Sequence, residues 1–164
     1  MKNNEKGELA SLTIKTIDNV YYTLNKKQIE FSAFLENISQ LSKIVEPIEL
    51  IICSKEMQKI IEFIYLDPIK LKEGYLSCEL KFRECDLLFI NKISPDDLIE
   101  LCNAANYLEA YYLLELTSFA ISRIFSDLPL SEMKKLFKYD DLTKNDKDHI
   151  FREYGWLPRP EEDC

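Results

Sequence analysis

The sequence predicts an α+β fold in which a small three-stranded sheet comes first and a series of helices follows. Residues typical of β-strands occur in three short segments near residues 12–52. Beyond Ser94, apolar residues recur every three or four positions, so most of 94–154 is expected to be helical. The 164 residues, of which 46% are hydrophobic and 30% charged, have the composition of an ordinary globular domain, with or without an appended subdomain.

The first two strands are expected to form a β-hairpin. Residues 12–17 alternate apolar and polar side chains, and Val20–Leu24 is rich in strand-forming residues. Asp18-Asn19 between them supplies turn residues, although less typical ones than Asn-Gly. Residues 1–11 are polar and are expected to be loose.

A helix, a third strand and a second helix are expected next. Residues 28–45 have mostly helical apolar spacing and end at Glu46-Pro47, and Ile48–Ile52 is apolar enough for a buried strand. Ser54 is expected to cap the second helix, which Asp67-Pro68 ends. The apolar stripe predicted for that helix consists of Met57, Ile60, Ile61, Ile64 and Tyr65. Residues 69–93 give little pattern, but their interleaved apolar side chains suggest a segment that packs.

A helix start is clearest at Ser94. Ser94 suits the N-cap, Pro95 the first helical position, and Asp96 and Asp97 the positive end of the helix dipole. Asp97 also stands three residues after the cap, as in a capping box. One apolar stripe is predicted at Leu98, Leu101, Ala105, Leu108 and Tyr112, and a second at Leu114, Thr117, Ile121, Ile124 and Phe125.

Asn106 and Tyr107 interrupt the first stripe and are expected to point partly away from the core. One interpretation is a surface amide beside a half-buried ring. The other is a contact patch, because exposed Tyr and Asn suit protein interfaces.

The composition argues against several classes of function. A net charge of −8 disfavours nucleic acid and anionic membranes as partners, and no apolar run approaches membrane-spanning length. The lone His149, the absence of CxxC and the lack of a nucleophile or phosphate-loop motif argue against a metal site, a cofactor and catalysis. Cys53 and Cys102 lie in apolar runs and are expected to be buried and reduced.

Residues Ala104-Ala105-Asn106-Tyr107-Leu108, with Leu113-Leu114 after them, resemble the central signature of Skp adaptors of cullin–F-box (SCF) ubiquitin ligases. AANYL also occurs in elongin C, so the tail is more specific. A short helix ending in Phe137, then a Thr143–Asp146 capping box and a helix before Trp156, resemble the Skp-type extension. The resemblance implies a BTB/POZ-like domain at 12–112, a Skp-type helical extension at 113–157 and a tail at 158–164.

The resemblance also implies an adaptor that bridges a cullin and F-box proteins in the cytoplasm and nucleus. Asn106 and Tyr107 match the family's cullin-binding positions. The F-box groove is expected at Ile121, Ile124, Phe125, Met133, Phe137, Ile150, Phe151 and Trp156, with Trp156 the strongest anchor. The residues themselves leave a simpler alternative open, in which the large apolar side chains of 113–157 all pack against the α+β unit. A Skp-like structural or decoy subunit that binds F-box proteins without a cullin is the alternative function.

Overall fold

The computed structural model describes residues 11–41, 47–71, 74–136 and 143–155. The chain forms two compact units, residues 1–126 and 127–164, each of which is described by itself. Of the terminus expected to be loose, residues 1–10 lie outside the described residues, as does the tail at 158–164, and Ser11 is instead the first residue of a strand. No helix in the described ranges is both long and apolar enough to cross a lipid bilayer.

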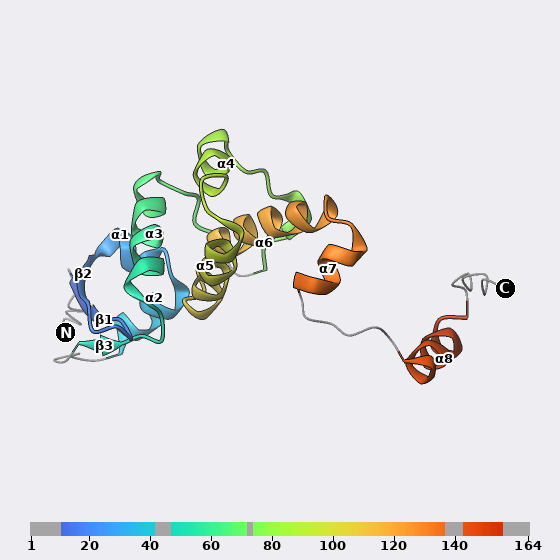
Figure 1. Ribbon diagram of the computed structural model, residues 1–164. Helices are drawn as coiled ribbons and strands as arrows, with labels where there is room; N and C mark the ends of the chain where they lie inside the picture. The colour runs from blue at the N-terminus through green and yellow to red at the C-terminus, as the bar shows by residue number, and fades with distance from the viewer. Residues whose placement is uncertain (1–10, 42–46, 72–73, 137–142, 156–164) are drawn as a thin grey trace, which may run out of the picture. The chain divides into compact units, whose positions relative to one another are not determined.

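The first unit begins with the predicted three-stranded sheet, in the order β2-β1-β3 (Figure 1). β1 (Ser11–Lys15) and β2 (Tyr21–Asn25) form the predicted antiparallel hairpin, in which Leu12 lies opposite Leu24. β3 (Ile48–Glu49) pairs with β1 in parallel. The expectation of a five-residue third strand was wrong, because the chain leaves the ladder after Glu49 and turns Ile51 into solvent, where it is 74% exposed.

The single helix expected over residues 28–45 is two helices, α1 (Lys26–Glu30) and α2 (Ala33–Gln40). Ser32 separates them: its backbone is extended, and its side-chain oxygen accepts a hydrogen bond from the N–H of Leu35 at 3.0 Å. An N-cap residue of this kind starts a new helix and therefore ends the preceding one.

α3 (Ser54–Tyr65) starts one residue earlier than expected, with Cys53 rather than Ser54 at the N-cap. The cap comes from the hairpin turn, where Asp18 accepts hydrogen bonds from the Ser54 N–H at 2.9 Å and from its hydroxyl at 2.5 Å. These bonds lower the pKa of Asp18 to about 2. The apolar stripe predicted for this helix is confirmed at Met57, Ile60 and Ile64, which are buried. It is wrong at Tyr65, which is 75% exposed.

Residues 69–93, whose sequence gives little pattern, contain a 3-10 turn, η1 (Ser77–Glu79), and α4 (Glu84–Ile90). Leu71 and Phe82 are partly buried against the hydrophobic core. The interpretation that this segment packs is therefore confirmed for these two side chains.

α5 (Pro95–Tyr107) and α6 (Tyr111–Ser126) follow. The helix start at Ser94 is confirmed, since its hydroxyl oxygen accepts from the Asp97 N–H at 3.3 Å. All five residues of the first predicted stripe are buried, although Tyr112 belongs to α6. Between the helices Glu109 adopts a left-handed conformation, φ 52°, and the Ala110 N–H returns to the Ala105 carbonyl at 2.9 Å. This is a Schellman-type helix end with Glu in place of the usual Gly.

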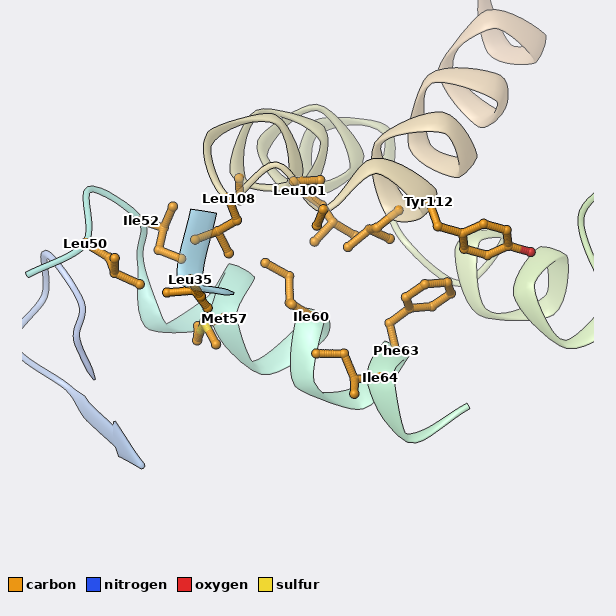
Figure 2. Packing of buried hydrophobic residues seen from close by; sticks show 14 of the residues in the cluster. Leu35, Leu50, Ile52, Met57, Ile60, Phe63, Ile64, Leu101, Leu108 and Tyr112 are labelled. Carbon is orange, nitrogen blue, oxygen red and sulfur yellow. The ribbon is translucent and has the colours of Figure 1, made fainter. Parts of the chain in front are cut away.

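The core of the first unit lies between α3, α5, α6 and the sheet. Figure 2 shows Ile60 and Phe63 of α3 directed toward Leu101 of α5 and Tyr112 of α6. Phe63 is fully buried, and its ring centroid lies 5.1 Å from that of Phe89 and 6.2 Å from that of Tyr112. Phe63 thus links α3 to α4 and α6, a role that the predicted stripe missed.

The second unit contains α7 (Leu130–Leu136) and α8 (Lys144–Glu153). The predicted capping box at the start of α8 is confirmed, with reciprocal hydrogen bonds between Thr143 and Asp146. The structure agrees with the predicted class: an α+β, BTB/POZ-like N-terminal part and a helical C-terminal part.

Candidate protein-binding site

The end of α5 presents the two residues that the sequence singles out. Asn106 is exposed and Tyr107 is half-buried, so both lie off the buried stripe as predicted. The Asn106 backbone carbonyl accepts from the Glu109 N–H at 3.1 Å in the helix end, and its side-chain amide faces solvent. A side chain with a free donor and a free acceptor is suited to pairing with a polar group of a partner.

Contacts with α2 fix the position of Tyr107. Its ring lies 5.4 Å from the ring of Phe34, at an interplanar angle of 46°. The buried Ser32 hydroxyl donates to the Leu108 carbonyl at 2.5 Å and so joins the start of α2 to the end of α5. One face of the Tyr107 ring is thereby packed, which leaves the rest of the side chain for another contact.

Tyr107 also borders a cavity of about 210 Å³ between the loop after β3 and α5. Asn106 does not line this cavity, so the structure places the two residues beside each other but gives them different surroundings. The loop contributes Ile51, Ile52 and Cys53, α3 contributes Glu56, and α5 contributes Glu100, Asn103, Ala104 and Tyr107.

Two features of this cavity were not found from the sequence. Ile51 was expected to lie in a buried strand, and its exposure supplies an apolar side chain at the rim. Cys53 was expected to be buried, and that prediction was wrong because the residue stands in the exposed loop before α3. No local sequence signal predicts the exposure of Ile51 or Cys53, because both exposures follow from the early end of β3.

The described residues predicted to bind an F-box are all half-buried. Ile121 and Ile124 on α6 pack partly against the core of the first unit, and Phe125 lies one residue further along. In the second unit, Met133 on α7 and Ile150 on α8 are half-buried. Phe137, Trp156 and the side chain of Phe151 lie outside the described part of the structure, so the full groove stays a prediction.

The alternative in which the apolar side chains of residues 113–157 pack against the α+β unit is correct at the start of α6. Leu113 and Leu116 are completely buried in the first unit, so they fill its core. Thr117, on the second predicted stripe, is buried too, but Leu114 of that stripe is only half-buried. Phe119 remains 40% exposed and lines a second cavity, of about 530 Å³, with Leu80, Phe82 and Leu87. Apolar surface therefore becomes accessible in the second half of α6.

A sequence model of the Skp1 family, dimerisation domain, matches residues 111–157 of the chain. The match starts at the first residue of α6 and extends beyond the end of α8, across both units. No curated protein matches the chain. The Skp-family match starts four residues after Tyr107, so the exposed end of α5 directly precedes the Skp-family segment.

Proposed function

We propose that the protein is an adaptor subunit of an SCF-type ubiquitin ligase, which bridges a cullin to F-box substrate receptors. The observation that carries the proposal is the Skp-family match over residues 111–157. F-box proteins bind through that region, and the cullin's N-terminal helices bind the end of α5 that carries Asn106 and Tyr107. The protein performs no chemistry in this role and works in the cytoplasm and nucleus.

The geometry of the first unit supports the cullin-binding half of the proposal. Tyr107 combines a large, rigid ring with one polar tip, and its position is fixed by Phe34. Asn106 is exposed beside it, and Ile51 adds an exposed apolar side chain across the cavity. An aromatic anchor with polar and apolar neighbours is the usual composition of an interface centre.

Reconstitution from purified components tests the proposal. The protein is mixed with an F-box protein and the N-terminal domain of a cullin from the same organism, and the mixture is separated by size-exclusion chromatography. We expect one peak that contains all three proteins. A stable complex with the F-box protein that excludes the cullin would instead favour the structural or decoy subunit, and binding of neither protein would contradict both.

A further inference from the structure

The cavity beside Tyr107 is also lined by two carboxylates, Glu56 from α3 and Glu100 from α5. Glu56 is only 8% exposed, which is unusual for a charged side chain without a basic partner. Its position in the first turn of α3 lets the helix dipole stabilise its charge. That stabilisation offsets part of the cost of burying this side chain, which lines the cavity.

The nearby basic side chains bind elsewhere. The ammonium groups of Lys55 and Lys59 both bind the carboxylate of Asp97, Lys59 at 3.0 Å. In the described part of the chain, the Glu56 carboxylate forms no ion pair with Lys55 or Lys59, and the thiol of Cys53 is close enough to interact with it. A thiol is a weak donor and carries no charge, so it does not neutralise a buried carboxylate.

Negative charges surround Cys53 on the wall of the cavity. The pKa of its thiol is raised, first by partial loss of water around the sulfur and then by the negative charges of Glu56, Asp18 and Glu100. A cation would therefore be attracted to this cavity.

The size and the walls of the cavity restrict the cation that fits. A volume of about 210 Å³ is below the roughly 300 Å³ at which small-molecule sites begin, but it can hold one long side chain. No group of three or more His, Cys, Asp or Glu in the described ranges could hold a metal ion. The apolar wall at Ile52 and Ala104 favours a weakly hydrated guanidinium over a strongly hydrated ammonium.

We infer that this cavity accepts an arginine side chain from the cullin's N-terminal helices, with its guanidinium bound by Glu56 and Glu100 and stacked on Tyr107. Guanidinium groups bind carboxylates through two parallel hydrogen bonds and also stack on aromatic rings. The inference rests on the proposed function for the identity of the partner, whereas the chemistry of the cavity rests on the residues that line it.

The first test does not need the partner. The ¹⁵N-labelled protein is titrated with methylguanidinium and, separately, with methylammonium, and the amide signals are followed by NMR. We expect methylguanidinium to shift the Asn103 side-chain amide and the backbone amides near Tyr107, and methylammonium to shift them less. Both responses should disappear in the double variant Glu56→Gln with Glu100→Gln. An absent response in the wild-type protein, or an equal response to both cations, would overturn the inference whether or not a cullin binds.

The second test measures affinity for the cullin N-terminal domain at low and high salt. We expect the same double variant to bind about tenfold more weakly at low salt and to lose most of the salt dependence. The matched control is Glu62→Gln with Asp96→Asn, which removes the same charge from exposed positions of the same two helices and should bind as wild type. Equal affinity of both variants would overturn the arginine site but leave the adaptor function intact, whereas no binding by the wild-type protein would contradict the adaptor function itself.

Discussion

At the scale of single residues, Asp86 joins three segments of the first unit. It has no exposed surface, and its carboxylate accepts from the Arg83 Nη2 at 2.7 Å and from the Tyr112 hydroxyl at 2.7 Å. Arg83 also donates to the carbonyls of Leu66 and Asp67, at the end of α3. Burial opposes the charge on Asp86, but hydrogen bonds from Arg83 and Tyr112 outweigh it and lower the pKa of the carboxyl. Burial, together with the hydrogen bond to Asp86, raises the pKa of Tyr112 to about 12.

Removing this carboxylate should destabilise the first unit strongly. We expect Asp86→Ala to lower the free energy of unfolding by about 3 kcal/mol, the lower end of the range for a broken buried pair, since Arg83 is 34% exposed. Tyr112→Phe, which removes one hydrogen bond and keeps the ring, should cost about 1.5 kcal/mol. Urea unfolding at neutral pH measures both.

The contribution of Asp86 to the free energy of unfolding should depend on pH in a direction that its lowered pKa determines. Because the folded pKa of Asp86 is lowered, its contribution to stability is present above the ordinary value of 3.8 and is lost as the pH falls through the folded pKa. The difference between wild type and Asp86→Ala should therefore shrink below about pH 4. A loss for Asp86→Ala no larger than that for Tyr112→Phe would show that the charge pair is not the main contribution.

At the scale of elements, the junction between α2 and α5 positions the proposed cullin site. Ser32 caps α2 through the Leu35 N–H and donates to the Leu108 carbonyl, and the Ala33 N–H donates to the Glu109 carbonyl at 3.4 Å. Both carbonyls belong to the end of α5, where helix carbonyls lack partners within the helix. α2 therefore supplies hydrogen-bond donors to the carbonyls at the end of α5 and holds Phe34 against Tyr107.

Ser32→Ala should weaken this junction. We expect a loss of about 1–2 kcal/mol in the free energy of unfolding, as for other N-cap removals, and a weaker affinity for the cullin domain because Tyr107 loses its fixed position. The control is Ser39→Ala in the same helix, where the hydroxyl donates only to the Glu36 carbonyl one turn earlier. Equal stability of the two variants in urea unfolding would show that the link to Leu108 contributes nothing.

The parts of the fold that the sequence predicted correctly depend on local signals. The helix start at Ser94-Pro95, the capping box at Thr143 and the hairpin turn at Asp18-Asn19 each involve residues close together in the chain. The break at Ser32 was missed because the contact that holds this serine in place, its hydrogen bond to the Leu108 carbonyl, joins residues far apart in the chain.

The binding site was predictable only in part for the same reason. Asn106 and Tyr107 stand out because they depart from a regular helical stripe, and their exposure agrees with that. Ile51, Glu56 and Glu100 come together at one cavity only through the packing of the loop after β3 and of α3 with α5. The spacing of residues within one segment of the sequence cannot predict that residues of different segments line the same cavity.

At the scale of the whole molecule, the sites proposed for the two partners lie in separate parts of the chain. The proposed cullin site lies at the end of α5, in the first unit. The proposed F-box region, residues 113–157, starts in the core of that unit with Leu113 and Leu116 and continues through α7 and α8 in the second unit. An adaptor needs this arrangement, because occupation of one site must leave the other accessible.

The central claim is therefore tested most directly by measuring both affinities in the double variant Asn106→Ala with Tyr107→Ala. We expect its affinity for the cullin N-terminal domain to fall about thirtyfold or more, the effect of losing about 2 kcal/mol from a hot spot, while its affinity for an F-box protein stays unchanged. The reciprocal variant Trp156→Ala should lose affinity for the F-box protein and keep the cullin. Thermal unfolding of each variant checks that it is folded. Cullin affinity that is unchanged by the double variant would contradict the account, and equal loss of both partners would show that the pair supports the fold instead.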